Sequence, residues 1–224
     1  MTRYAIIVAG GSGTRFGANI PKQFLPLGDK LVLMHTISKF QSVDNTKIIV
    51  VLPQASIEWW QELCQEYSFT CPHMVVAGGS NRFESVNNAL KAITPDADDL
   101  IAVHDGVRPL VSTNLIEAAY KQAQAVGSAI PAVAVTDSIR QLTDGNSSIA
   151  LSRDSLRAVQ TPQTFRAELL TKAYNVPYSP FFTDDASVVE NFGQEVHLIE
   201  GEVNNLKITH PQDLVIAELL MNSK

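Results

Sequence analysis

A glycine-rich segment, GGSGTRFG at residues 10–17, is the strongest chemical feature of this sequence, and it directly follows the apolar run Tyr4–Ala9. Glycine lets successive backbone N–H groups converge on one spot, because no Cβ stands in the way, and such concave clusters bind phosphate groups. The Walker pattern is absent, and the dinucleotide pattern fails at Phe16. A plain tight turn is the alternative interpretation of these glycines.

Two cations accompany this loop. Arg15 lies inside it, and Lys22 follows Pro21, which stiffens the chain. A glycine cradle beside two positive charges suits a triphosphate, because both features attract phosphate oxygens. The spacing alone leaves open that both side chains are solvated surface charges.

The elements that position these residues follow from hydrophobic periodicity. We expect strands at 4–9, 47–52, 74–77, 100–104 and 128–135, and helices at 31–40, 56–67, 82–93 and 113–125. Strands that alternate with helices predict an α/β fold with a Rossmann-like, doubly wound, mostly parallel sheet. Ligands of such sheets lie at the carboxyl ends of the strands, so the loops after Val8, Ala77 and His104 should form the site.

The alternation breaks in residues 136–158, which are polar and contain the turn signal Asp144-Gly145. Short segments on both sides of this turn predict a protruding β-hairpin arm. An isolated hairpin is marginally stable, so we expect the arm to pack on something, with a second subunit as the candidate. Helices at 166–174 and 184–191, a strand at 195–199, an extended segment at 206–209 and a helix from Pro211 complete a single domain, 1–224.

The composition limits the function classes. Of the 224 residues, 45% are hydrophobic, enough to bury a core, and the net charge of −6 argues against broad nucleic-acid binding. The two cysteines, Cys64 and Cys71, match no zinc-site spacing and fit a reducing compartment. We find no export signal and no apolar stretch near the ~18 residues that span a bilayer, so we expect a cytoplasmic protein without membrane contact.

The glycine loop is the first of several motifs. Gly10-Gly11-x-Gly13-x-Arg15 and Pro21-Lys22-Gln23-Phe24 precede His104-Asp105-x-x-Arg108-Pro109, Gln160-Thr161-Pro162-Gln163, Thr183-Asp184-Asp185-Ala186 and Asn205-Leu206-Lys207-Ile208-Thr209. In this order they resemble the nucleotidyltransferases that make CDP-activated polyols, and most of all the family of 2-C-methyl-D-erythritol 4-phosphate cytidylyltransferases. The resemblance implies transfer of a cytidylyl group from CTP to that polyol phosphate in the non-mevalonate isoprenoid pathway, with release of pyrophosphate.

The resemblance also implies roles for individual residues. Arg15 and Lys22 would hold the triphosphate and stabilise the transition state, and Arg153, Thr161 and Lys207 would hold the second substrate. Further substrate contacts are implied for the loop residues Ala9, Gly10, Gly11 and Gly13, for Gly79, Ser80 and Ser85 near the cytosine, for Asp105, Gly106 and Arg108 near the ribose and phosphates, and for Thr183 and Asp184. Asp137 and Ser138 fall in the arm, which the family inserts into a neighbouring subunit's site, so a homodimer is implied. Asn81 departs from the family, in which an acidic residue is common at this position.

The implied chemistry is in-line attack of the acceptor's phosphate oxygen on the α-phosphorus of CTP. The second pKa of a phosphate monoester is about 6, so this nucleophile is largely dianionic at neutral pH and needs no general base. Positioning and cationic stabilisation then supply most of the catalysis. Mg²⁺, or another divalent cation, is implied as a bridge between triphosphate oxygens, with Asp105 as a candidate contact.

Simpler interpretations remain open at this point. Ser85 could be a serine in the first turn of a helix, and Arg108 could form a structural ion pair. Asp105 and Asp184 could each be the N-cap of a helix. Thr161-Pro162 could be an extended turn, because a residue before proline favours β conformations. We expect His104 to pack inside a strand end rather than to act as a base.

A ribitol-5-phosphate cytidylyltransferase is the nearest alternative function. A non-catalytic nucleotide-binding module and an NAD(P)-dependent dehydrogenase are more distant, and Leu52-Pro53-Gln54 disfavours the dehydrogenase because no acidic residue ends the second strand.

Overall fold

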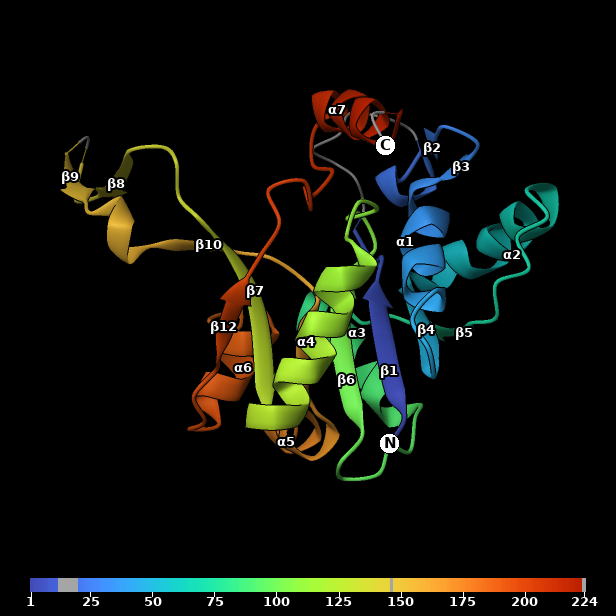
Figure 1. The fold of residues 1–224 in the computed structure, drawn as a ribbon, viewed down its shortest axis with the longest axis horizontal. Coiled ribbons are helices and arrows are strands. Elements are labelled where there is room, and N and C mark those ends of the chain that lie inside the picture. Colours follow the sequence, from blue (N-terminus) through green and yellow to red (C-terminus); the bar gives the residue numbers. More distant parts are fainter. Residues whose placement is uncertain (12–19, 146, 223–224) are drawn as a thin grey trace.

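The computed structural model describes residues 1–11, 20–145 and 147–222. Eight strands form the central sheet: β1 (Arg3–Val8), β4 (Thr46–Leu52), β5 (Met74–Ala77), β6 (Leu100–Asp105), β7 (Ser128–Ala134), β10 (Arg157–Val159), β11 (Gln163–Arg166) and β12 (Leu198–Glu200). They lie in the order β10-β7-β11-β6-β1-β4-β5, and β12 pairs with β7 (Figure 1). β1 pairs in parallel with β4 and β6, and β4 pairs in parallel with β5, which confirms the predicted parallel core.

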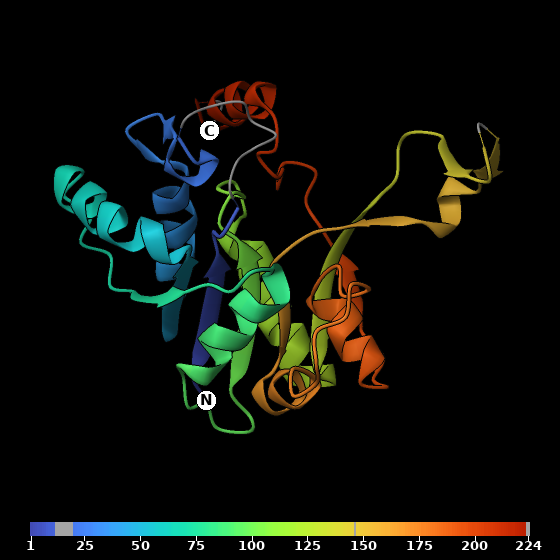
Figure 2. The ribbon, with the colours of Figure 1, turned by 180° about the vertical axis from the view of Figure 1, so that it is seen from behind.

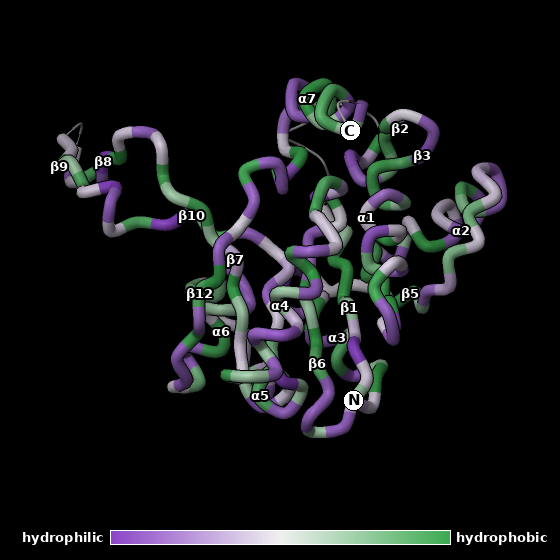
Figure 3. The backbone as a smooth tube through the Cα atoms, viewed as in Figure 1, coloured by the Kyte–Doolittle hydropathy of each residue, from purple (hydrophilic) through white to green (hydrophobic). Residues whose placement is uncertain are grey.

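Helices cover both faces of this sheet (Figures 1 and 2). One face packs against α1 (Val32–Gln41), α2 (Ile57–Glu66) and α4 (Thr113–Val126), and the other against α3 (Arg82–Lys91), α5 (Ala167–Ala173) and α6 (Asp185–Asn191). Successive side chains of a strand point to opposite faces, so Ala5 and Ile7 of β1 enter the first core while Tyr4 and Ile6 enter the second. The doubly wound architecture is therefore confirmed, and Figure 3 shows the hydrophobic residues along β1 and β6 that two-sided burial requires.

Two strands of the sheet, β10 and β11, lie outside the sequence prediction. β11 runs antiparallel to both β6 and β7 and separates them. Its residues, QTFR, contain one large apolar side chain, Phe165, so no apolar run marks the strand. The open edges of β6 and β7 supply its backbone hydrogen bonds, and this is a tertiary effect that local periodicity does not contain.

A third apolar cluster closes the carboxyl end of the sheet. The short hairpin of β2 (Pro26–Leu27) and β3 (Lys30–Leu31) and the last helix, α7 (Pro211–Asn222), lie above the end of β1 in Figure 1. They bury Leu27, Val107, Ile208 and Ala217 together. The segment expected to be extended at 206–209 enters this cluster without joining a strand.

The predicted arm is present as a hairpin. β8 (Ile139–Leu142) and β9 (Ser148–Leu151) pair in antiparallel fashion, and η4 (Arg153–Ser155), a 3-10 helix, follows them. Both views show this arm projecting away from the body of the protein (Figures 1 and 2). Within the described ranges, no helix is both long enough and apolar enough to cross a bilayer.

We expect Phe165→Ala to lower the free energy of unfolding by about 3–5 kcal/mol, because this fully buried ring anchors β11 in the second core. Urea denaturation followed by circular dichroism measures the loss. Phe181→Ala, at a ring that is 85% exposed, is the matched control and should change stability by less than about 0.5 kcal/mol. Equal losses in the two variants would contradict the role of β11 in the core.

Candidate active site

A cavity of about 350 Å³ opens at the carboxyl ends of β1, β5 and β6. Its walls come from the loop after β1, from the 3-10 helix η2 (Lys22–Phe24), from the loop before α3, from the end of β6 and from the segment before α7. Nine residues predicted from the sequence line it together: Ala9, Gly10, Gly11, Lys22, Gly79, Ser80, Ser85, Asp105 and Lys207. Gly13 and Arg15 lie outside the described residues.

Backbone hydrogen bonds hold the loops of this cavity close together. The Ala9 N–H donates to the Val51 carbonyl at 2.9 Å, and the Gly106 N–H donates to the Val8 carbonyl at 2.9 Å. A Cβ on Gly106 would lie 2.9 Å from the Cβ of Ala9, which is closer than real Cβ contacts allow. Gly106, predicted as a substrate contact, therefore has a packing role: it permits the loops after β1 and β6 to approach each other.

The loop before α3 is organised by serine and asparagine side chains. The Ser85 hydroxyl accepts from the Gly79 N–H at 3.1 Å and donates to the Asn81 carbonyl at 2.8 Å. The Asn81 side chain caps α3 by accepting from the Glu84 N–H, and the Ser80 hydroxyl donates to the Glu84 carboxylate at 2.8 Å. Ser85 is thus a first-turn helix serine, and it also lies in the cavity wall, where the resemblance implies a substrate contact.

Three cations surround one carboxylate, Asp105, in the wall of the cavity. The Asp105 Oδ2 atom lies 3.0 Å from the Lys207 Nζ atom and 3.2 Å from the Arg108 Nε atom. Burial of Asp105 opposes its ionisation, but the charges of Lys207, Arg82 and Arg108 outweigh burial and hold the pKa of this carboxyl well below its usual range. Arg108 therefore forms an ion pair, which was the structural alternative to its role as a substrate contact. The following helix, α4, is capped by Ser112 and not by Asp105.

A buried pair of side chains lies behind Asp105. The Thr161 hydroxyl accepts from the Asp105 N–H at 3.1 Å and donates to His104 Nδ1 at 3.0 Å, while His104 Nε2–H donates to the Arg108 carbonyl at 3.2 Å. Burial lowers the pKa of His104 to about 4, so the imidazole is neutral at physiological pH. His104 packs at the strand end as expected. Thr161, predicted to hold the second substrate, is buried beneath the cavity and supports Asp105 from there.

Arg82 lines the cavity and was missed by the sequence analysis. Its Nη2 atom lies 2.6 Å from the Asp185 carboxylate, which is fully buried and also accepts from the Tyr174 hydroxyl at 2.6 Å. Burial opposes the charge of Arg82, but Asp185 outweighs this and raises the arginine pKa above its ordinary value. The Thr183–Ala186 motif contained the partner carboxylate, but nothing in the sequence paired it with an arginine 103 residues away.

The other residues of that motif serve α6. Asp184 caps the helix in a reciprocal capping box with Ser187 and accepts from Gln163 Nε2 at 2.8 Å. Thr183 is exposed. Neither side chain lines the cavity, so the helix-cap interpretation of Asp184 is the one that the geometry bears out.

The arm residues lie apart from this cavity within one chain. Arg153 donates to the Thr136 carbonyl at 2.6 Å, and Asp137 and Ser138 precede β8 on the same arm. Figure 1 shows the arm on the far side of β7 from the end of β1. A single chain does not bring Arg153 to Lys22 and Lys207.

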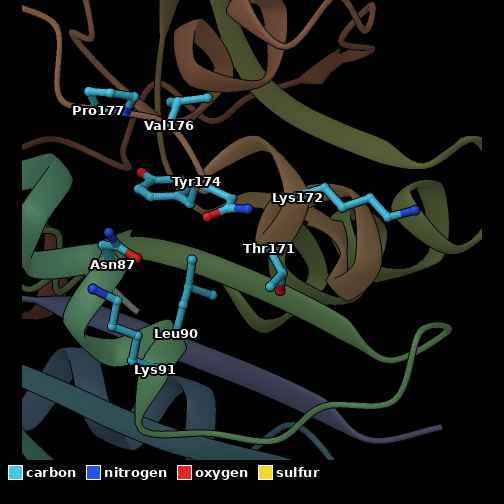
Figure 4. A pocket seen from close by; sticks show the side chains of 9 residues that line it. Asn87, Leu90, Lys91, Thr171, Lys172, Tyr174, Val176 and Pro177 are labelled. Atoms are coloured by element: carbon cyan, nitrogen blue, oxygen red, sulfur yellow. The ribbon is translucent and has the colours of Figure 1, made fainter.

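A larger cavity, of about 580 Å³, lies between α3 and α5 (Figure 4). Its lining includes Asn87, Lys91 and Tyr174, and Lys172 extends away from Asn87 and Lys91 to pair with Glu168 at 2.6 Å. None of the predicted site residues lines it. Size therefore does not select the candidate site here; the convergence of glycine loops and cations on the smaller cavity does.

A glycine loop and lysines at the carboxyl ends of a parallel sheet suit an enzyme that binds phosphate groups, and comparisons with known proteins place the chain among the nucleotidyltransferases. A family model described as 2-C-methyl-D-erythritol 4-phosphate cytidylyltransferase matches residues 4–223. The chain belongs to this family.

Individual relatives match over their full length. The 2-C-methyl-D-erythritol 4-phosphate cytidylyltransferase of Porphyromonas gingivalis is 51% identical over 223 residues, which cover 99% of this chain and 98% of that protein. The enzyme of the same name from Bacteroides thetaiotaomicron is 48% identical over 222 residues, covering 99% of this chain and all of that protein. The crystal structure of the Francisella tularensis enzyme of this name superimposes with a TM-score of 0.82 at 35% identity, covering 98% of this chain and 99% of that one.

We expect Asp185→Asn to lower the free energy of unfolding by about 3–5 kcal/mol, because it leaves the Arg82 charge half-buried without its partner. Chemical denaturation at neutral pH measures this loss. Glu168→Gln removes the exposed pair with Lys172 and is the matched control, and it should leave the stability close to the wild-type value. If the two variants were equally stable, the Arg82–Asp185 pair would not be a structural anchor of the cavity.

Proposed function

We propose that this chain transfers a cytidylyl group from CTP to 2-C-methyl-D-erythritol 4-phosphate, forming 4-diphosphocytidyl-2-C-methyl-D-erythritol and pyrophosphate. Family membership over nearly the whole chain supports this reaction. The observation that carries it is the single cavity in which the Gly10-Gly11 backbone, Lys22 and Lys207 converge from distant parts of the sequence.

The side chains of the cavity fit a reaction between two anions. The attacking phosphate is its own nucleophile, so the site needs cations and alignment rather than a general base. Lys22 would neutralise charge that develops on the α-phosphate and the pyrophosphate, and Lys207 would hold the acceptor's phosphate. Arg15, outside the described residues, is assigned to the triphosphate on its motif alone.

We infer that Mg²⁺, or another divalent cation, accompanies CTP. Across residues 1–11, 20–145 and 147–222, no group of three or more His, Cys, Asp or Glu side chains is arranged to hold a metal, and Asp105 is the carboxylate of the cavity wall. The triphosphate oxygens would therefore provide most of the ligands, with Asp105 as the protein contact. When bound, the ion would neutralise phosphate charge.

We also propose a homodimer in which the arm of one subunit, residues 136–158, reaches the site of its neighbour. Leu142 is 81% exposed and Ile149 is 52% exposed, although both lie on a two-stranded hairpin. A hairpin of this kind needs apolar cover to be stable. The arrangement would carry Arg153, Asp137 and Ser138 to a cavity that they do not reach within their own chain.

Two free thiols, Cys64 and Cys71, support a cytoplasmic location.

Pyrophosphate release from CTP, measured with a panel of polyol phosphates, tests the reaction. We expect Lys22→Ala to lower turnover by about 10²-fold, because it removes a cation that stabilises the transition state. Lys172→Ala, on the exposed surface, is the matched control and should keep normal turnover. A folded Lys22→Ala protein with unchanged kcat would refute the role of this lysine.

The same panel separates the acceptors. The family match favours 2-C-methyl-D-erythritol 4-phosphate over ribitol 5-phosphate, and the preferred acceptor should have the higher kcat/KM. Equal values for both acceptors would contradict the proposed substrate.

A mixing experiment tests the shared site. Arg153→Ala and Lys207→Ala should each raise KM for the acceptor far more than KM for CTP. If Arg153 acts in the partner's site, subunit exchange between the two variants makes half of the dimers mixed. In each mixed dimer, one site combines the intact Lys207 of one subunit with the intact Arg153 of the other, and the second site lacks both. Activity should then recover to about a quarter of the wild-type value. Failure of the fully exchanged mixture to recover activity would contradict the proposed dimer.

A further inference from the structure

Gln23 is a buried polar side chain to which the proposed reaction gives no role. It is only 1% exposed and lies in η2 between Lys22 and Phe24. Its amide nitrogen, Nε2, donates to the Ala9 carbonyl at 2.9 Å and lies 3.4 Å from the Gly11 carbonyl. One carboxamide thus contacts two carbonyls at the start of the glycine loop.

These contacts fix which groups of the loop face the cavity. Across a trans peptide bond, a carbonyl and the following N–H point in opposite directions. Because the Ala9 carbonyl is aimed at Gln23, the Gly10 N–H is aimed away from it. Gly10 is exposed and lines the cavity, so this orientation leaves its backbone donor accessible to a ligand.

Gln23 also fixes the distance between the loop and Lys22. The Ala9 N–H ties the loop to β4 through Val51, and Gln23 ties the same residue to η2. On the other side of η2, the Phe24 ring stacks on Trp60 with ring centroids 5.8 Å apart and meets the edge of Trp59 at 5.0 Å. The turn that carries Lys22 is therefore held between the loop and α2.

We propose that Gln23 is a positioning residue that holds the start of the glycine loop, Ala9–Gly11, and Lys22 at the spacing required by a nucleoside triphosphate. The inference rests on the proposed function, because it concerns the same nucleotide site. The role needs a neutral side chain with two N–H donors. Glutamate would place a carboxylate against two carbonyl oxygens, and methionine would fill the space without any donor.

The test compares Gln23→Met with wild-type enzyme. Calorimetric titration with CTP and Mg²⁺ should show a Kd raised about tenfold or more, and kcat should fall by about 10- to 10²-fold, because small misplacements of a reacting group are costly. KM for the acceptor should stay within about twofold, since Gln23 contacts none of the residues assigned to the acceptor. Gln23→Glu should weaken CTP binding further, because it buries an unpaired charge.

Tyr120→Phe is the matched control. The Tyr120 hydroxyl is buried and donates to the Tyr4 carbonyl at 2.9 Å, near the opposite end of β1 from the glycine loop. The substitution also removes one buried bond to the backbone, so Tm should fall as in Gln23→Met while Kd for CTP stays at the wild-type value. Should Gln23→Met fail to fold, Gln23→Asn keeps the amide on a shorter stem and should raise Kd for CTP by a smaller factor.

The outcomes separate the two levels of inference. Wild-type enzyme that binds no CTP would overturn the proposed function and this role with it. Wild-type enzyme that binds CTP, together with a folded Gln23 variant of unchanged CTP affinity, would overturn the role of Gln23 alone. So would a variant that loses affinity for CTP and acceptor in equal proportion, because that result marks a general loss of structure.

Discussion

The rest of this site depends on the ion pairs that the carboxylate of Asp105 forms with the cations around it. Asp105 ends β6 and pairs with Lys207 and Arg108, which come from the segment before α7 and from the turn after β6. Without this negative charge, Lys207, Arg108 and Arg82 would repel one another in a partly buried space. The carboxylate therefore permits the protein to concentrate positive charge where a triphosphate and a phosphate monoester are proposed to meet, and it joins the C-terminal segment to the sheet.

Hydrogen bonds of buried side chains next to Asp105 and Arg108 support this cluster of charges. Thr161 holds the Asp105 backbone, and His104 links Thr161 to the Arg108 carbonyl. The side-chain amide of Asn205 donates to the Thr161 carbonyl at 2.8 Å, and the backbone carbonyl of Asn205 accepts from Arg108 at 2.7 Å. These bonds fix the Asp105 backbone and the Arg108 turn, although the buried Oδ1 atom of Asn205 has no hydrogen-bond partner among the described residues. The motifs around residues 104, 161 and 205 thus act mainly by hydrogen-bonding to Asp105 and Arg108 and holding them in place.

The body and the arm divide the proposed reaction between them. The body holds the Gly10-Gly11 backbone and two lysines in one cavity, where we propose that CTP binds. The arm holds Arg153 and exposed apolar side chains at a distance from that cavity. The proposed acceptor site, completed by a second subunit, would give this exposed hairpin both a function and apolar cover. Specificity for the acceptor would then depend on assembly, whereas recognition of phosphate would depend on the single chain.

The sequence by itself determined the features that are encoded locally. Apolar runs and helical periodicity located β1, β4, β5, β6 and β7 and the helices between them, and the glycines marked the loops at one edge of the sheet. The position of Lys22 near the glycine loop followed from its closeness to that loop in the sequence. Tertiary structure alone decided the rest. β11 is a strand because β6 and β7 offer it hydrogen-bonding edges, Arg82 meets Asp185 across 103 residues, and Thr161 lies beneath the cavity rather than in its wall. Each of these depends on which distant segment folds alongside, and a pattern of neighbouring residues carries no record of that.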